Sequence, residues 1–209
     1  MGVRTWWEER VLPRAVDATL SDVTAGGWRR TTTAGLHGEV LELGFGSGRN
    51  LPYYPPEVSR VLAVEPADLA WERARGRRDA FGRPVERVGL DGASLPVPDA
   101  SVDAVVSTWT LCTIPELDAA LAEAQRVLRP GGELRFVEHS IAPGGLTRRV
   151  QQGVQPVWGR FAGGCHLDRD ITGHLTDAGF RVGLDHAGYV VPHVMRPWGW
   201  FVHGRAHPA

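Results

Sequence analysis

The chain has 209 residues, with 23 arginines and lysines against 24 aspartates and glutamates, and its formal net charge is −1. The length predicts a single domain, residues 1–209, with a full hydrophobic core, and the balanced charge gives no reason to expect nucleic acid or an anionic membrane surface as a partner. No apolar run approaches the ~20 residues of a membrane span and no secretory signal is visible, so we expect a cytoplasmic protein.

The two cysteines, Cys112 and Cys165, do not make a disulfide framework or a metal site. Cys112 follows a predicted core strand, and we expect it to be buried and inert. No spacing of histidine and cysteine suggests metal ligands, so the sequence predicts no metal.

Residues 1–36 lack strand alternation and are predicted to be helical, with a break at Gly26 and Gly27. Apolar side chains recur there at the spacing of one helical stripe; they are Trp6, Trp7, Val11, Leu12, Ala15, Val16 and Leu20. Two interpretations stay open. The segment packs as a helix on the sheet edge, or it forms a lid that brings a tryptophan or Arg29 and Arg30 to a ligand.

Five short apolar strands follow, at 40–43, 60–65, 84–90, 102–107 and 133–137. Helices are predicted over 68–80, with Asp68 as the cap, and over 116–128. This order of strands and helices is typical of a parallel, doubly wound sheet.

The final part of the chain predicts two more helices, 146–161 and 170–178, and then two strands, 180–188 and 197–205, around a turn. We expect these strands to form an antiparallel hairpin at the edge of the sheet. The predicted fold is therefore α/β and Rossmann-like, with a doubly wound, mainly parallel seven-stranded sheet and a C-terminal antiparallel hairpin.

Three glycines, Gly44, Gly46 and Gly48, end the first strand in the run VLELGFGSG, in which Glu42 is the odd polar residue. Glycine lets the backbone turn sharply and lets a ligand approach the bare main chain. We expect the segment 48–54 to open a helix whose free N–H groups face that ligand.

Glu65 ends the second strand, 65 − 44 = 21 residues after the first of these glycines. A carboxylate at about this distance, at the tip of the next parallel strand, can accept both ribose hydroxyls of a nucleoside, and the alternative is a glutamate that is merely solvated. Since the carboxyl ends of parallel strands meet at one edge of the sheet, Asp91, Trp109 and His139 are expected beside it.

The glycine spacing separates two kinds of nucleoside ligand. Dinucleotide-binding domains carry Gly-x-Gly-x-x-Gly, whose third glycine gives close packing of helix and strand. Here the spacing is Gly-x-Gly-x-Gly, and position 49 is arginine. This spacing fits a ligand with no pyrophosphate, such as S-adenosylmethionine (SAM).

The motifs between roughly residues 38 and 140 resemble those of class I SAM-dependent methyltransferases. They are VLELGFGSG (40–48), Glu65, LDGA (90–93), LPVPDASVDAVV (95–106) and RVLRPGGEL (126–134). The resemblance implies that Glu65 binds the ribose hydroxyls and Asp91 the adenine amine, that the glycine turn approaches the methionine end, and that Trp109 flanks the sulfonium. The cofactor-binding residues it implies, for SAM and its product S-adenosylhomocysteine (SAH), are Glu42, Gly44, Gly46, Gly48, Asn50, Glu65, Pro66, Asp91, Gly92, Ala93, Thr108 and Trp109.

Further motifs are similar to the methyltransferase-like family whose animal members are thiol S-methyltransferases. They include Asn50 with YPP (54–56), TLC (110–112), FVEH (136–139), QQ (151–152), PVW (156–158), GCHLDR (164–169) and RP (196–197). Those relatives carry an N-terminal hydrophobic anchor that this sequence lacks, so membrane attachment is not implied.

A thiol acceptor reacts as its thiolate, so a nearby base would assist the reaction. His139, at the end of the fifth strand, is the best candidate for that base, and the alternative is a structural histidine bonded to a neighbouring loop. His166 and Asp168, in the polar loop that follows, are second candidates.

We therefore predict a SAM-dependent methyltransferase that acts on a small molecule, with a thiol as the preferred acceptor. Two alternatives stay open: a lipid amine or a natural-product oxygen or nitrogen as the acceptor, and a SAM-binding protein that does no chemistry. The sequence does not indicate an oligomeric state.

Overall fold

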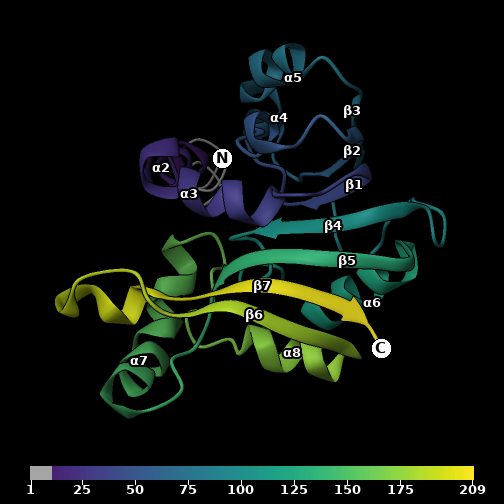
Figure 1. The fold of residues 1–209 in the computed structure, drawn as a ribbon. Coiled ribbons are helices and arrows are strands. Elements are labelled where there is room, and N and C mark those ends of the chain that lie inside the picture. Colours follow the sequence, from purple (N-terminus) through teal and green to yellow (C-terminus); the bar gives the residue numbers. More distant parts are fainter. Residues whose placement is uncertain (1–10) are drawn as a thin grey trace.

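A seven-stranded sheet forms the centre of the computed structural model, which describes residues 11–209 (Figure 1). The strand order is β3-β2-β1-β4-β5-β7-β6. The first five of these pair in parallel and β7 is antiparallel to both of its neighbours, which confirms the predicted fold. The strands are β1 (Gly38–Leu43), β2 (Val58–Val64), β3 (Val85–Gly89), β4 (Val102–Thr108), β5 (Leu128–His139), β6 (Phe180–Tyr189) and β7 (Trp200–Pro208).

The chain reverses its direction of travel across the sheet beside β1. It runs outward from β1 through β2 to β3, and then returns to place β4 on the other side of β1, where Leu41 pairs with both Leu62 and Val105. Ligands of such sheets bind outside the carboxyl ends of the strands at this switch point. The fold therefore directs attention to the ends of β1, β2 and β4.

Helices cover both faces of the sheet. On one face Phe136 of β5 packs with Leu121 of α6 and Leu175 of α8. On the other face Val137 packs with Ala25 of α3, because successive strand residues point to opposite sides. The helices are α2 (Leu12–Thr19), α3 (Asp22–Thr33), α4 (Asp68–Arg73), α5 (Arg75–Phe81), α6 (Leu117–Val127), α7 (Gly145–Phe161) and α8 (Ile171–Asp177), with short 3₁₀ helices η2 (Leu51–Tyr53) and η3 (His193–Trp198). Within residues 11–209 no helix is both long and apolar enough to cross a membrane.

The predicted break at Gly26 and Gly27 is wrong, because both glycines lie inside α3. A Cβ atom at Gly26 would lie 2.6 Å from the hydroxyl oxygen of Tyr53. Gly26 therefore serves the close approach of α3 to η2 and does not end the helix. Trp6 and Trp7 of the predicted stripe lie outside the described residues.

Two further helix predictions need correction. The segment after the glycine turn forms only η2, since Pro52, Pro55 and Pro56 lack the N–H groups that a helix needs. The predicted helix 68–80 is divided into α4 and α5 at Ala74, a fully buried residue. The N-cap of α4 is Ala67, whereas Asp68 is the first residue of the helix and pairs with Arg87 at 2.6 Å.

Candidate active site

A cavity of about 750 Å³ opens at the carboxyl ends of β1, β2, β4 and β5. Gly44, Glu65, Trp109 and His139, which follow or end these four strands, all contribute to its wall. The expected convergence of strand ends is thus present in the structure. The predicted cofactor residues that line the cavity are Gly44, Gly46, Glu65, Pro66, Asp91, Gly92, Thr108 and Trp109.

The glycine turn has a backbone that other residues rarely adopt. Gly44 and Gly46 have φ angles of 67° and 59°, in the left-handed region. A Cβ atom at Gly44 would also lie 2.0 Å from the hydroxyl oxygen of Thr110. Gly44 is therefore required both for the turn and for the approach of the loop that follows β4.

The Glu65 side chain is buried and joined to the glycine turn. Its Oε2 accepts the backbone N–H of Gly46 at 2.6 Å, and its Oε1 accepts that of Ala67 at 2.7 Å. Burial raises the pKa of Glu65 above its ordinary value, although these two hydrogen bonds favour the carboxylate. Each carboxylate oxygen keeps a second lone pair, so the side chain can still accept two hydroxyls from a ligand in the cavity.

Asp91 follows β3 and lines the cavity beside the ends of β1 and β2. Its side chain is exposed to solvent, and its Oδ1 accepts the backbone N–H of Ala93 at 2.9 Å. Ala93 does not line the cavity, whereas Gly92 does. Ala93 therefore orients the Asp91 carboxylate and does not itself form the wall.

Glu42 and Asn50 lie behind the cavity wall in a buried polar network. Glu42 accepts hydrogen bonds from Asn50 Nδ2 at 2.9 Å and from the Tyr54 hydroxyl at 2.7 Å. Asn50 in turn accepts from Arg29 Nη1 at 2.8 Å and donates to the Thr108 hydroxyl at 3.1 Å. Burial raises the pKa of Glu42 to about 7, against the opposing effect of these partners.

Glu42 and Asn50 were predicted to bind the cofactor, and the structure places both side chains behind the cavity wall. The two side chains connect the interior of β1 to α3 and to the end of β4, and they make no part of the cavity surface. Gly48 is likewise outside the wall, where a Cβ atom would lie 3.2 Å from that of Ala74. Glu42, Gly48 and Asn50 therefore pack on the side of the glycine turn that faces away from the cavity.

Asp17 places α2 over the glycine turn. Its carboxylate accepts hydrogen bonds from the Ser47 hydroxyl, from Arg49 Nε and from Arg73 Nη2, each at 2.5 Å. Burial alone would raise the pKa of Asp17, but the three donors hold it well below its usual range. Both N-terminal alternatives thus describe part of the structure, since α3 packs on the sheet, while Asp17 of α2, Leu20 after it and Arg29 of α3 line the cavity.

Trp109 directly follows β4, lines the cavity and has a strained backbone conformation. Its φ angle is 55°, in the left-handed region, which is rare for a large side chain. Its indole Nε1 is buried and has no hydrogen-bond partner among residues 11–209. The ring lies 5.2 Å from the guanidinium carbon of Arg29, so an aromatic surface with an available N–H donor borders the cavity.

Glu138 is a structural residue that the sequence analysis missed. Its fully buried carboxylate accepts the Ser107 hydroxyl at 2.7 Å and the backbone N–H groups of Thr110, Leu111 and Cys112 at 3.0–3.2 Å. Burial raises the pKa of Glu138, and the four donors oppose that effect. The signal in the sequence was an acidic residue directly after the apolar residues Phe136 and Val137 at the end of a predicted strand.

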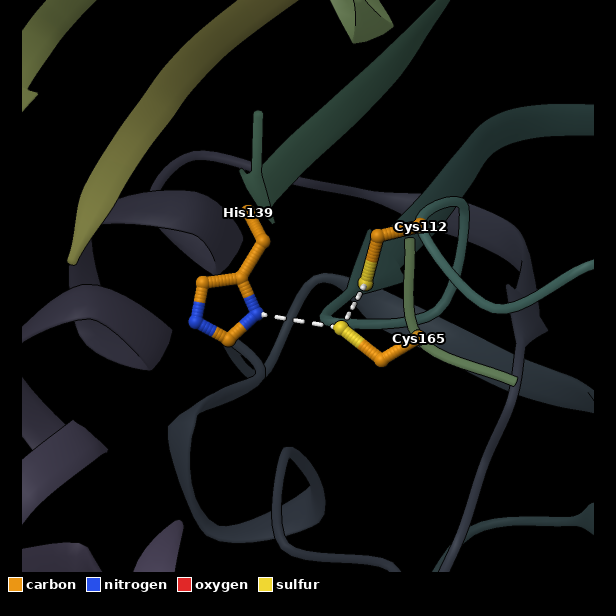
Figure 2. Close-up of side chains that lie close together, drawn as sticks. All are labelled: Cys112, His139 and Cys165. Carbon is orange, nitrogen blue, oxygen red and sulfur yellow. Dashed lines mark hydrogen bonds between the residues drawn. The ribbon is translucent and has the colours of Figure 1, made fainter. Parts of the chain in front are cut away.

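His139 lies beside both cysteines (Figure 2). Its Nδ1 is 3.6 Å from the sulfur of Cys165, which is 3.8 Å from the sulfur of Cys112. All three residues line the cavity, although Cys112 is buried as predicted. The short contact between the sulfurs lowers the pKa of Cys165 and raises that of Cys112, and the imidazole of His139 adds to the lowering.

His166 and Asp168 are not brought into the cavity. Their side chains are 43% and 34% exposed, and His166 Nδ1 lies 3.7 Å from Asp168 Oδ1. The backbone N–H of His166 instead donates to the carbonyl of Cys112 at 2.8 Å. The loop that carries His166 and Asp168 therefore contributes Cys165 to the cavity wall and one backbone hydrogen bond to Cys112.

Comparisons with known proteins agree with this geometry. Residues 41–136 match a family model described as a methyltransferase domain. The chain is 38% identical over 154 residues to the thiol S-methyltransferase TMT1B of Homo sapiens, covering 70% of this chain and 62% of the relative. It is 34% identical over 132 residues to the phosphatidylethanolamine N-methyltransferase of Cereibacter sphaeroides, covering 59% of this chain and 63% of the relative. The chain spans less than two thirds of the length of these relatives.

The fold is shared with solved methyltransferase structures. A SAM-dependent methyltransferase from Thermotoga maritima has a TM-score of 0.67 at 21% identity, with 96% of this chain and 98% of that chain covered. The domain match over residues 41–136 and the 34–38% identity to thiol S-methyltransferases support placing the chain among the class I SAM-dependent methyltransferases, and the shared fold agrees with that placement. Within that family, its sequence lies near the branch of the thiol S-methyltransferases TMT1A and TMT1B.

Proposed function

We propose that this chain transfers the methyl group of SAM to the sulfur of a small thiol. The observation that carries the proposal is that one continuous cavity is lined at one end by Glu65 and at the other by His139. A nucleoside bound at the first end would place its reactive group toward the second. The cavity thus has room for a cofactor and an acceptor together.

The chain's own residues divide the work of holding the cofactor. Glu65 would accept the ribose hydroxyls and Asp91 the adenine amine, while the turn at Gly44 and Gly46 would face the methionine end. Trp109 would border the sulfonium, whose positive charge is attracted to an aromatic face. The strand order β3-β2-β1-β4-β5, which sets these residues along one edge of the sheet, and their presence in the cavity wall support these roles.

Methyl transfer requires an acceptor sulfur in line with the reacting carbon. The bond from the methyl carbon to the sulfonium sulfur breaks as the acceptor sulfur forms its bond to that carbon, which leaves SAH and a thioether. Holding the two atoms about 3–3.5 Å apart and aligned can supply much of the rate. The acceptor must first lose its proton, because the thiolate is the nucleophile, and His139 is the titratable base nearest to that end of the cavity.

The composition of the acceptor end favours a thiol over an amine. Its described wall includes Trp109, Trp158, Phe161 and the two cysteines, whereas the acidic side chains of the described wall, Asp17, Glu65 and Asp91, belong to the cofactor end. A protonated amine would need a carboxylate close to its nitrogen. The similarity to thiol S-methyltransferases supports the same choice.

The test is transfer from methyl-labelled SAM to a panel of small thiols, amines and phenols, with phosphatidylethanolamine vesicles as a further acceptor. We expect label in thioethers alone. Label only in amines, phenols or the lipid would refute the thiol assignment and support the corresponding alternative. Binding of SAH in a calorimeter without transfer to any acceptor would support a SAM-binding protein that does no chemistry.

A further inference from the structure

Cys112, His139 and Cys165 form a compact group of metal-ligating atoms at the acceptor end of the cavity. The two sulfurs and one imidazole nitrogen all lie within 4.8 Å of one another. They come from three separate segments: the loop after β4, the last residue of β5, and the loop before α8. Figure 2 shows the Cys165 sulfur placed between the other two groups.

The spacing of these atoms matches what a tetrahedral zinc ion requires. With Zn–S bonds of about 2.3 Å and Zn–N bonds of about 2.0–2.1 Å, two sulfurs lie about 3.8 Å apart, and a sulfur and a nitrogen about 3.6 Å apart. The observed distances are 3.8 Å between the sulfurs and 3.6 Å between Cys165 and His139. The third pair, Cys112 and His139, lies within 4.8 Å and needs at most a small movement.

The backbone around the two cysteines is held in place by hydrogen bonds. Gln155 of α7 donates to the carbonyl of Cys165 at 3.1 Å and accepts the N–H of Leu167 at 2.8 Å. The Cys112 carbonyl accepts the N–H of His166, and the Cys112 N–H donates to Glu138. Ligands fixed in this way need little reorganisation when a metal binds.

The charges near the cluster also suit a divalent cation. A zinc ion with two thiolates and a neutral imidazole carries no net charge. Beside it lie the buried carboxylate of Glu138 and the guanidinium of Arg169, which donates to the carbonyls of Leu111 and Ile114 at 2.7 Å and is attracted electrostatically to Glu138. A neutral assembly avoids the large cost of a buried unpaired charge.

We propose that Cys112, His139 and Cys165 bind a zinc ion whose fourth coordination position faces the cavity. Three protein ligands and one open position are the arrangement of catalytic zinc sites, and thiolates and imidazole are ligands that zinc prefers. The sequence predicted no metal because each of the three segments contributes a single ligand. Only the fold brings the set together.

The role of this zinc rests on the proposed function, which it deepens. The acceptor thiol takes the fourth position and releases its proton to water, because a thiol bound to zinc is deprotonated outright. The zinc-bound sulfur then attacks the methyl carbon, and the neutral thioether, a weaker ligand, departs. In this scheme His139 acts as a ligand and the metal replaces it as the group that generates the thiolate.

The experiment measures zinc directly and does not depend on methyl transfer. The reduced chain of 209 residues, stripped with a chelator and titrated with Zn²⁺, should bind one ion per chain. Loss of a residue that only supports a metal ligand lowers metal affinity by about 10–100-fold. Cys165→Ser and Cys112→Ser each remove a ligand, so each should lower the zinc affinity by more than that. Titration with Co²⁺ should give a sulfur-to-metal charge-transfer band in the wild type that both variants weaken.

His166→Ala is the matched control, because it removes an adjacent imidazole that lies outside the cavity, and it should bind zinc as the wild type does. SAH binding by calorimetry shows that each variant is folded. Failure of the folded, reduced wild type to bind zinc would overturn the proposal, and so would recovery of only a Cys112–Cys165 disulfide. Full thiol methylation by the metal-free protein would exclude the catalytic role, whereas zinc binding without any methylation would count against the proposed function alone.

Discussion

Gly46 donates its backbone N–H to the carboxylate of Glu65 across 2.6 Å, so the turn after β1 and the acid after β2 form a single unit. Because this hydrogen bond joins them, a displacement of the Glu65 side chain is coupled to a displacement of the glycine turn. The geometry of the cofactor end therefore depends on a contact between two strands that are adjacent in the sheet. A change at either residue should affect both the shape of the turn and the binding of the nucleoside.

We expect Glu65→Ala to weaken SAH binding by about 10- to 100-fold. The change removes the proposed acceptor for the ribose hydroxyls and leaves the N–H groups of Gly46 and Ala67 without this partner. A hydrogen bond to a charged group contributes about 1.5–3 kcal/mol, so the expected loss corresponds to about one such bond. Calorimetric titration with SAH measures the effect. Glu72→Ala, at an exposed glutamate of α4, should leave the affinity unchanged, and an unchanged affinity in Glu65→Ala would remove its assigned role.

Gly44→Ala should abolish SAH binding and destabilise the fold, because the new methyl group would meet Thr110 at 2.0 Å and the residue would keep a positive φ. Gly27→Ala is the matched change, since a Cβ atom there has no heavy atom within 4 Å and lies inside α3. It should stabilise the protein by about 0.5–1 kcal/mol. Urea unfolding compares the two, and equal stabilities would contradict the steric account.

The buried Glu42 should make the stability depend on pH. Burial raises its pKa to about 7 in the folded chain, whereas an unfolded glutamate titrates near 4.3. The folded state then binds more protons between these values, so this contribution is complete below about pH 4.3 and is lost as the pH rises through 7.

Glu42→Gln should remove that dependence. Relative to this variant, the wild type should lose up to about 2 kcal/mol of unfolding free energy between pH 5.5 and pH 8. Denaturant unfolding gives the difference in unfolding free energy between wild type and variant at each pH. The change in this difference between the two pH values is the test, since the amide also changes the bonds to Asn50 and Tyr54 at both. Parallel pH profiles for the two proteins would show that Glu42 is ionised throughout.

Asp17→Asn tests whether α2 closes over the cofactor end. The amide loses charge-assisted hydrogen bonds to Arg49 and Arg73, so we expect weaker SAH binding, by about tenfold, and faster proteolysis within α2. Asp22→Asn serves as the control, because that side chain is half exposed and lies 3.4 Å from Arg49. Equal SAH affinity and equal proteolysis rates in the two variants would show that Asp17 does not hold α2 against the glycine turn.

The sequence was sufficient to predict the sheet and the cofactor end. Both depend on local patterns: short apolar strands, the glycine turn at Gly44 and an acid that ends the next strand. It could not show that Gly26 lies within a helix, because that placement depends on the contact with Tyr53 across the fold. Nor could it assign Glu42 and Asn50 to a network behind the wall. Both faces of the buried strand that carries Glu42 look alike in sequence, and Asn50 bonds to Arg29 and Thr108, which lie far from it along the chain.

The acceptor end was harder to predict for a related reason. Cys112 and Cys165 are 165 − 112 = 53 residues apart, and only the pairing of β4 with β5 and the path of α7 bring their sulfurs within 3.8 Å. Glu138 and Trp109 are similar cases, in which a single side chain or φ angle organises a loop from a distance. Such relationships have no fixed spacing along a chain.

The position of β7 between β5 and β6 also has a consequence for biosynthesis. The strand β6 leaves the ribosome before β7, its one partner among the strands of residues 11–209, has been made. Until the last residues emerge, β6 has no strand to pair with and β5 presents an open edge that can pair with other chains. A chain that stops before Trp200 would therefore lose two strands of the sheet rather than one, and we expect such products to aggregate or to be degraded.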